Sequence, residues 1–360
     1  MSITPTDHAV RTLKDGYWDH TALVRQPDGS LRVRKSNKHP TTTSGPWGTE
    51  SLRREIRYLL DLSPGDAICF PSVLHHWDTL GDADAAVGYE MPYYPTHRDA
   101  GVLAREEQLD QAEIDRFQDQ LADLLFGHVH VPAPTAESLS RHFDQAVTRA
   151  FEGLSADPML PRLLDAERLT LNGTVMRGPR AAWQFIQHET DMLAELDQEP
   201  GVRLHGDFFL ENILWRPLSL HDQSATPALI MIDPVSVAGI SRGPALFDLV
   251  KYVSYASGEL LALRSEWVEL DGFDATTADP VFSYRIKWQA PGLRPFQNRD
   301  WHSRFTSAYL DHHGVWDRRR YALIDGYFSA AMALNTRGHQ RQARLLKATL
   351  EFNRVLGLAV

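Results

Sequence analysis

The chain has 360 residues, of which 43% are hydrophobic, and its formal net charge is -10. This length allows a sizeable core and two lobes, while the negative charge disfavours nucleic acid as a partner. Its single cysteine, Cys69, excludes an internal disulfide; no apolar run reaches the roughly 18 residues of a membrane helix, and the first residues lack a signal-peptide pattern. We therefore expect a cytoplasmic protein without a membrane partner.

The first predicted elements form a hairpin. Residues 21–25 and 30–35 have strand character and flank Gln-Pro-Asp-Gly, a typical turn sequence. In the second strand Leu31, Val33 and Lys35 alternate with two arginines. Because strand side chains alternate between faces, Lys35 shares a face with two apolar residues. The alternative is a lysine that lies along the strand with its amine in solvent.

A helix is predicted next, over residues 49–62. Apolar residues recur there at positions 52, 56, 59 and 60, which is helical spacing, and either Thr49 or Ser51 is expected to cap its start. Glu55 lies inside this helix. Its alternative role is that of a surface partner of Arg54 or Tyr58.

Two further strands, 71–74 and 85–92, are predicted to complete an N-terminal lobe of residues 1–92. Pro92 marks the exit because proline cannot donate to a strand ladder. In the remaining lobe, residues 93–360, we expect helices at about 103–126, 136–152 and 181–196. Strands are expected at 202–204, 213–215 and 228–233. The rest is expected to be mostly helical, except for an irregular aromatic segment at about 270–300. The pattern predicts an α+β fold with a small β-rich lobe containing one helix and a larger, mostly helical lobe.

Polar side chains interrupt the apolar run from Val202 to Trp215. Asp207 and Asn212 lie in the loop between its two strands, and Asp233 ends the next strand. If these strands pair as a hairpin, the three side chains converge. Carboxylates about 4 Å apart repel by roughly 4 kcal/mol at an effective dielectric constant of 20, so such a cluster is best explained by a divalent cation. Oxygen ligands favour Mg²⁺; the alternative is that the three residues cap a turn.

Other chemistries find less support in the sequence. Histidines cluster at His75-His76, His128-Val-His130 and His312-His313, but none has a second ligand pair at zinc-site spacing. No Gly-x-Ser-x-Gly motif is present, and Cys69 lies among apolar residues. The basic run from 337 to 347 is typical of a solvated helix face.

Three ordered blocks carry a resemblance to a known family. They are His205-Gly-Asp-x-x-x-x-Asn212, the Ile-Asp pair that ends at Asp233, and Gly243-Pro-Ala-Leu-Phe-Asp-Leu-Val250. Together they resemble the aminoglycoside phosphotransferase and choline kinase superfamily, relatives of the protein kinases, with Val250 in place of the usual alanine. The resemblance implies a protein-kinase-like two-lobe fold.

For the N-terminal lobe, the resemblance implies a nucleotide site for ATP. Lys35 is expected to contact its phosphates and to pair with Glu55, for which Glu50 is the rival. The turn that covers the phosphates is expected near Gly16, within residues 16–21, which hold one glycine where protein kinases have three. The purine is expected against the backbone of Glu90 and Met91.

For the other lobe, the resemblance assigns catalytic and supporting roles. Asp207 is expected to accept or orient the proton of the attacking hydroxyl. Asn212 and Asp233 are expected to hold Mg²⁺. His205 and Asp248 are expected to support the loop by hydrogen bonds without touching substrate.

The acceptor is expected to bind near an aromatic stretch and a later helix, with Tyr284, Lys287, Tyr327 and Arg337 as candidate contacts. The basic residues favour an anionic acceptor, whereas the overall charge favours a cation. We therefore predict a small-molecule kinase whose acceptor is an antibiotic, a sugar, an amino alcohol or a biosynthetic intermediate, of open oligomeric state. The alternatives are a catalytically silent nucleotide-binding scaffold and a nucleotidyltransferase.

Overall fold

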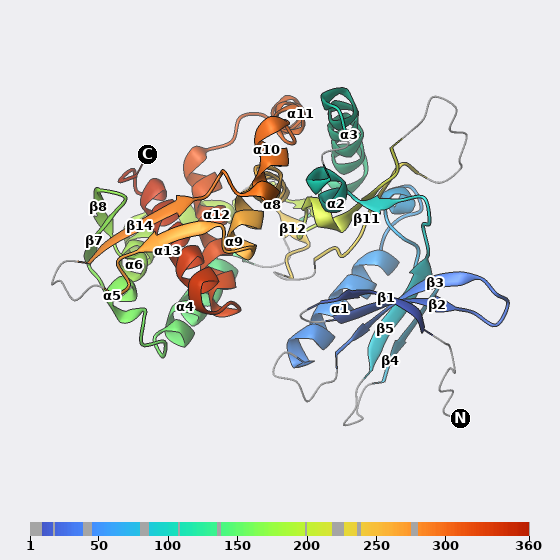
Figure 1. Ribbon diagram of the computed structural model, residues 1–360, viewed down its shortest axis with the longest axis horizontal. Coiled ribbons are helices and arrows are strands. Elements are labelled where there is room, and N and C mark those ends of the chain that lie inside the picture. The colour runs from blue at the N-terminus through green and yellow to red at the C-terminus, as the bar shows by residue number, and fades with distance from the viewer. Residues whose placement is uncertain are drawn as a thin grey trace. The chain divides into compact units, whose positions relative to one another are not determined.

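The computed structural model describes residues 9–16, 19–38, 45–79, 86–106, 109–134, 138–198, 200–217, 227–235, 239–274 and 280–359. The chain forms two compact units (Figure 1). The first unit comprises Met1–Leu103, Asp123–Val131 and Leu204–Ser241, and the second comprises Ala104–Ala122, Pro132–Arg203 and Arg242–Val360. The first unit therefore includes the segment of Asp207, Asn212 and Asp233, which the predicted boundary after Pro92 assigns to the C-terminal lobe.

A five-stranded antiparallel sheet forms much of the first unit. Its order is β1 (Ala9–Asp15), β2 (Asp19–Arg25), β3 (Leu31–Asn37), β5 (Val87–Pro92) and β4 (His75–Asp78). The β2–β3 hairpin confirms the prediction, with Thr21 opposite Lys35. Strand β1 had no sequence signal, because all seven of its residues are exposed and no apolar alternation marks it.

Helix α1 (Gly45–Leu60) packs against strands β3 and β5. Its buried side chains include Leu52, Ile56 and Leu59, at the spacing that predicted the helix, and Glu55 is buried with them. The predicted cap is wrong, because the helix begins at Gly45 and encloses both Thr49 and Ser51. Thr49 instead accepts a hydrogen bond from the side chain of Asn37.

The strand predicted at 71–74 is wrong, since the edge strand β4 begins at His75. Residues 71–74 follow a short 3₁₀ helix (Asp66–Cys69) and have no regular structure. Pro71 has no N–H to donate. Among the described residues, the one backbone hydrogen bond that links residues 71–74 to a strand runs from the Leu74 N–H to the carbonyl oxygen of Glu90, at 2.8 Å. Chain pairing therefore starts four residues later than the apolar pattern indicates.

A second small sheet brings distant segments of the first unit together. Its order is β11 (Leu229–Met231), β10 (Ile213–Trp215) and β6 (Arg98–Asp99), all antiparallel. Ile213 lies opposite Met231, and the Ile232 N–H donates to the carbonyl of Asn212 at 2.9 Å. The start of β10 and the end of β11 thus lie at the same end of the sheet, as the predicted hairpin requires.

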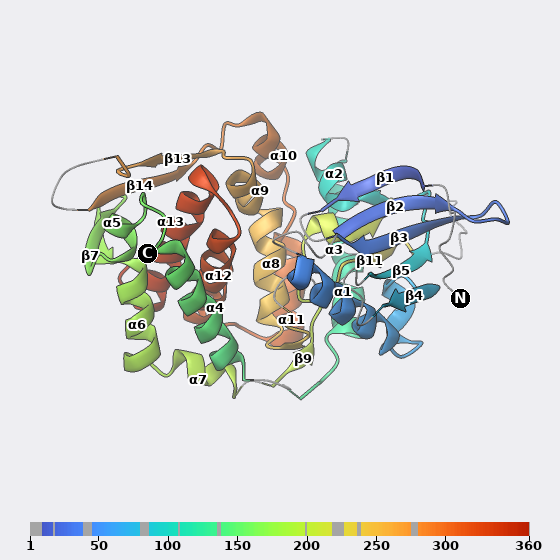
Figure 2. The same ribbon diagram turned by 90° about the horizontal axis from the view of Figure 1, so that it is seen from below.

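The second unit is mostly helical, and its helices α4, α12 and α13 lie side by side (Figure 2). The predicted helix at 103–126 is divided into α2 and α3, with a π-turn at Leu125–Val129, and that at 181–196 into α6 and α7. The helices from α2 onward are α2 (Ala100–Arg105), α3 (Gln111–Leu124), α4 (Leu139–Leu154), α5 (Pro161–Leu164), α6 (Pro179–Glu189), α7 (Met192–Leu196), α8 (Leu246–Ala256), α9 (Glu259–Arg264), α10 (Arg294–Asn298), α11 (Ser303–His313), α12 (Arg318–Leu334) and α13 (Gly338–Val355).

The segment predicted to be irregular, 270–300, contributes strands to a four-stranded sheet. Its order is β13 (Val268–Asp271), β14 (Val281–Ile286), β7 (Arg168–Leu171) and β8 (Thr174–Arg177). Strand β14 has alternating buried and exposed residues, but the aromatic residues around it obscured this pattern. A short antiparallel pair, β9 (Val202–Arg203) and β12 (Arg242–Gly243), also belongs to this unit.

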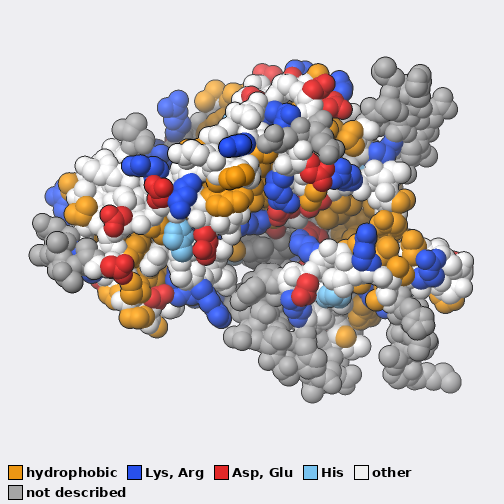
Figure 3. Space-filling model, in the orientation of Figure 1, with side chains coloured by type: hydrophobic (Ala, Val, Ile, Leu, Met, Phe, Trp, Pro, Cys, Tyr) orange, Lys and Arg blue, Asp and Glu red, His pale blue; other side chains and the backbone are white. Residues whose placement is uncertain are grey.

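None of the helices in the described ranges is both long and apolar enough to cross a membrane. On the face drawn in Figure 3, acidic and basic side chains are interspersed, so the net charge of -10 is not gathered into one patch there.

Candidate active site

Lys35 is at the centre of the polar cluster in the first unit. Strand alternation turns it inward beside Val33, and only 1% of the residue is exposed. Its Nζ lies 2.9 Å from Oε1 and 2.7 Å from Oε2 of Glu55 on α1. The hydroxyl of Tyr89 on β5 donates to Oε1 of Glu55 at 2.7 Å. Three elements therefore fix one buried ion pair.

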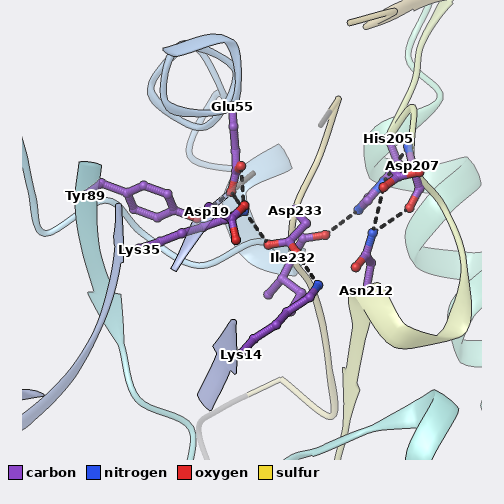
Figure 4. Close-up of polar contacts among 10 residues, drawn as sticks. All are labelled: Lys14, Asp19, Lys35, Glu55, Tyr89, His205, Asp207, Asn212, Ile232 and Asp233. Carbon is purple, nitrogen blue, oxygen red and sulfur yellow. Dashed lines mark hydrogen bonds and ion pairs between the residues drawn. The ribbon is translucent and has the colours of Figure 1, made fainter. Parts of the chain in front are cut away.

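Asp233 joins this pair from the segment that follows β11 (Figure 4). Its Oδ1 lies 2.8 Å from Lys35 Nζ, and its Oδ2 lies 3.2 Å from Nζ of Lys14 on β1. Asp19 on β2 lies 3.5 Å from Lys35 Nζ. Asp233 adopts a φ of +56°, a left-handed conformation that aspartate tolerates better than most residues. Two lysines thus face three carboxylates, so the cluster has one more carboxylate than ammonium group and can accept a further cation.

The pKa values of this cluster reflect burial and mutual attraction. Burial alone would raise the pKa of Asp233, but the charges of Lys35 and Lys14 outweigh it and lower that pKa far below its ordinary value. Burial opposes the charged form of Lys35, yet the carboxylates of Asp233 and Glu55 raise its pKa well above its ordinary value. Burial raises the pKa of Glu55 to about 7, against the attraction of Lys35. The lysine therefore stays charged at neutral pH.

Asp207 and Asn212 lie close together on the other side of Asp233 (Figure 4). Asn212 ends a short 3₁₀ turn (Leu210–Asn212), and its Nδ2 donates to the carbonyl of Asp207 at 2.9 Å and to its Oδ2 at 3.3 Å. Both residues are at least 96% buried, since their exposed fractions are 4% and 1%. Oδ1 of Asn212 is buried without a hydrogen-bond partner among the described residues. Such an oxygen is suited to a cation.

His205 connects the segment of Asp207 with that of Asp233. The backbone N–H of Asp207 donates to His205 Nδ1 at 3.3 Å, so Nδ1 is unprotonated. Nε2 then carries the proton and donates to the carbonyl of Ile232 at 3.0 Å. Gly206 has a φ of +82°, and a Cβ there would lie 2.4 Å from the carbonyl oxygen of Ile240. Only glycine fits this position without a shift of the backbone.

The position of Glu50 excludes it as the partner of Lys35. Glu50 has a side chain that is 43% exposed and pairs with arginines of its own helix, Arg54 at 3.5 Å and Arg53 at 3.9 Å. Glu55 is 1% exposed. In the described residues it is therefore Glu55, and not Glu50, that pairs with Lys35.

The residues predicted to contact the nucleotide lie on, or next to, strands of the sheet that also holds Lys35. Gly16 follows β1, and a Cβ there would lie 2.9 Å from Oδ1 of Asp19; positions 17 and 18 of the predicted turn lie outside the described residues. The side chain of Glu90 pairs with Arg34 at 2.7 Å and Arg32 at 3.2 Å. Met91 is 5% exposed.

The remaining predicted residues belong to the second unit. Asp248 is fully buried in the first turn of α8. Tyr327 is buried, stacks on Phe143 and shares a 2.9 Å hydrogen bond with the ring of His142. Tyr284 is also buried, whereas Lys287 and Arg337 are exposed. The four acceptor candidates thus divide into two core residues and two surface residues.

Sequence reasoning did not identify Lys14, Asp19 or Tyr89. Lys14 lies on the unpredicted strand β1, and Asp19 begins β2 ahead of the predicted start. Tyr89 lies on the predicted final strand, and alternation along β5 would have been its only signal. Strand pairing brings each of them to the cluster around Lys35, and this pairing cannot be read from the linear sequence.

The chemistry of the donor set fits a hard cation. The described ranges contain no group of three or more His, Cys, Asp or Glu side chains able to hold a metal ion by themselves. A cation at this position would therefore use the unpartnered oxygen of Asn212 and the carboxylate of Asp233, with its other ligands from water or a substrate. That arrangement is typical of Mg²⁺ bound with phosphates.

Comparison with known proteins identifies a family over most of the chain. The family model described as "Phosphotransferase enzyme family" matches residues 9–280. No curated protein matches the chain.

Solved structures give distant matches. A glucosamine kinase in complex with glucosamine, ADP and inorganic phosphate is 14% identical, with 99% of this chain and 95% of that chain covered and a TM-score of 0.41. A structure titled as a putative fructosamine-3-kinase from Thermobifida fusca is 15% identical, with 97% and 94% covered and a TM-score of 0.43. Choline kinase from Cryptosporidium parvum is 12% identical, with 98% and 88% covered and a TM-score of 0.46.

Proposed function

The chain belongs to the phosphotransferase enzyme family, and on this basis we propose that it transfers the γ-phosphoryl group of ATP to a hydroxyl group of a small molecule in a Mg²⁺-dependent reaction. The acceptor classes are an antibiotic, a sugar, an amino alcohol or a biosynthetic intermediate. Membership of the family supports the transfer of a phosphoryl group. The side chains of the first unit support ATP as the donor and Mg²⁺ as the metal.

The observation that carries the proposal is the position of Lys35 between Glu55 and Asp233. Its Nζ lies 2.7 Å from a carboxylate oxygen of Glu55 and 2.8 Å from one of Asp233. A lysine that is paired with a helix glutamate and lies beside a metal-binding aspartate is the arrangement by which kinase-like enzymes hold nucleotide phosphates. Lys35 would bind the phosphates, and Glu55 would hold its side chain in place.

Asp207 is the proposed acceptor of the hydroxyl proton. Its carboxylate receives a hydrogen bond from Asn212 Nδ2, which would orient it toward an incoming hydroxyl. His205 fixes the backbone at Asp207 by accepting its N–H. Asn212 Oδ1 and Asp233 would hold Mg²⁺, which when bound neutralises the charge of the phosphates. Phosphoryl transfer depends mainly on this positioning and neutralisation.

The experiment that tests this proposal measures the mass of the product. The purified protein is incubated with ATP, Mg²⁺ and a panel of small alcohols from the four acceptor classes. An acceptor whose mass rises by one phosphate supports the proposal. A rise by one nucleotide would show nucleotidyl transfer, and ATP binding without any product across the panel would favour a silent nucleotide-binding protein. Asp207→Asn serves as the matched inactive control.

A further inference from the structure

Tyr89 lies beside the pair of Lys35 and Glu55 but belongs neither to the proposed nucleotide contacts nor to the proposed metal ligands. Its exposed fraction is 0%. Its strand, β5, pairs with β3 on one side and with β4 on the other, so that Tyr89 lies opposite Lys35 and opposite His76. A buried strand with both edges paired is among the most stable parts of a fold. Tyr89 therefore has a rigid position in the sheet.

The hydroxyl of Tyr89 acts as a hydrogen-bond donor. Burial raises the pKa of this phenol well above its ordinary value, so it stays protonated at neutral pH. It donates to Oε1 of Glu55 at 2.7 Å, its one hydrogen-bond partner in the described part of the chain. The same oxygen accepts a hydrogen bond from Lys35 Nζ at 2.9 Å, and Oε2 accepts another at 2.7 Å (Figure 4). The phenol and the ammonium group together fix the orientation of the carboxylate.

Glu55 depends on these two donors. Its carboxylate has no other hydrogen-bond donor among the described residues. Burial raises its pKa to about 7, whereas the charge of Lys35 and the hydrogen bonds from Lys35 and Tyr89 act against this rise. Loss of the hydroxyl would leave Lys35 as the sole group that orients this carboxylate.

Lys35 also has carboxylates other than Glu55 within reach. Asp233 Oδ1 lies 2.8 Å from its Nζ, and Asp19 Oδ2 lies 3.5 Å away. Asp233 is also a proposed ligand of Mg²⁺, so Glu55 is the hydrogen-bonded partner of Lys35 that a metal would not share. The position of the ammonium group relative to the phosphates thus depends on how firmly Glu55 is held. The sheet holds it through Tyr89.

From these contacts we propose that Tyr89 is a positioning residue for the nucleotide phosphates, because its hydroxyl holds Glu55, which in turn holds Lys35. The inference rests on the proposed function and adds to it a residue that acts through two other side chains. The role is specific to the phosphate end of the nucleotide. It predicts a selective loss of phosphate recognition, with recognition of the base retained, when the hydroxyl is removed.

The test is calorimetric titration of Tyr89→Phe and the wild type with ATP in the presence of Mg²⁺ and, separately, with adenosine. Adenosine has the base and ribose of ATP but no phosphates. The affinity for ATP should fall by about threefold to tenfold, the range for one hydrogen bond, while the affinity for adenosine stays the same. Unchanged affinity for ATP, or equal losses for the two ligands, would overturn the proposal.

Tyr252→Phe is the matched control. Tyr252 lies on α8 in the second unit, its exposed fraction is 0%, and its hydroxyl donates to the carbonyl of Trp301 at 2.6 Å. This variant also loses one buried hydrogen bond, so its melting temperature should fall much as that of Tyr89→Phe does, without a change in ATP affinity. An equal loss of ATP affinity in the control would show a general effect of stability, against the proposal. Failure of Tyr89→Phe to fold, when Tyr252→Phe folds, would assign the hydroxyl to stability and would also overturn it.

A second measurement tests the route through Lys35. In the background Lys35→Met/Glu55→Gln, which lacks the ammonium group, Tyr89→Phe should not weaken ATP binding further. Contributions that are independent would add instead. A further loss as large as that in the wild-type background would show that Tyr89 acts by another route, against the proposal.

The wild type separates this inference from the proposed function. If the wild type binds ATP and phosphorylates an acceptor, and Tyr89→Phe binds ATP equally well, only the role of Tyr89 is overturned. If the wild type binds no ATP, the proposed function is overturned, and this inference with it. Selective loss of ATP affinity in Tyr89→Phe, with the control unchanged, is the result that the structure predicts.

Discussion

Lys35 and Asp233 are 198 residues apart in the chain, yet Lys35 Nζ and Asp233 Oδ1 lie 2.8 Å apart. The same ammonium group contacts both oxygens of Glu55. One buried cation therefore joins strand β3, helix α1 and the segment that follows β11.

Lys35→Met should destabilise the protein by about 3–5 kcal/mol, because it leaves Glu55 and Asp233 buried without their cation. Urea denaturation of variant and wild type measures the loss. The double variant Lys35→Met/Glu55→Gln should recover part of it, since one uncompensated carboxylate is removed. Lys38→Met, which breaks a pair with Asp15 at 3.0 Å near the surface, is the control and should cost much less. Equal losses for the two single variants would refute the central role of Lys35.

Asp233→Asn should show a stability deficit that depends on pH. The lysines lower the pKa of Asp233 in the folded state, so its charged form stabilises the fold. The deficit of the variant should be complete above about pH 4, the ordinary value for aspartate, and should shrink as the pH falls below it toward the lowered pKa. Chemical denaturation at a series of pH values measures this. A deficit that is constant with pH would contradict the prediction.

Asn212→Ala should raise the Mg²⁺ concentration needed for half-maximal activity. The variant loses the unpartnered Oδ1, and changes around metal ligands typically weaken metal affinity by about tenfold to hundredfold. Initial rates at fixed ATP and varied Mg²⁺ provide the measurement, with Asn298→Ala, an exposed asparagine of α10, as the control. An unchanged Mg²⁺ dependence would remove Asn212 from the metal site.

Lys14→Met should weaken ATP binding by about threefold to tenfold, the range for one hydrogen bond to a partly exposed group. The side chain of Lys14 is 53% exposed and reaches Asp233 from β1, next to the turn that has only one glycine. We expect its charge to contact the phosphates beside this turn. Lys14→Arg should preserve most of the affinity in a direct binding assay. Tighter ATP binding by Lys14→Met would instead indicate that Lys14 competes with the metal for Asp233.

The sequence predicted elements well where burial is periodic. Alternation in β3 indicated the inward position of Lys35, and helical spacing indicated α1 with Glu55 on it. Strand β1 was not predicted because its seven residues are all exposed. Without a buried face, a strand has no period of two to detect.

Only the part of the candidate site that lies in local sequence motifs could be predicted. The spacing of Asp207, Asn212 and Asp233 indicated one cluster, and the hairpin of β10 and β11 follows from the apolar runs on either side. Lys14 and Tyr89 were missed because their contacts arise from strand pairing across the sheet. The acceptor site was not predictable, since the aromatic residues proposed for it, Tyr284 and Tyr327, have a pattern that core residues share.

The most direct test of the proposed function compares Asp207→Asn with the wild type in two measurements on the same preparations, turnover of an identified acceptor and affinity for ATP. Asparagine keeps the size of the side chain but cannot accept a proton as a carboxylate does. Turnover should fall by about 10²- to 10⁴-fold, the contribution of a general base, while the ATP dissociation constant changes little. A variant that keeps most of the wild-type rate would contradict the account, because phosphotransfer would then not depend on Asp207.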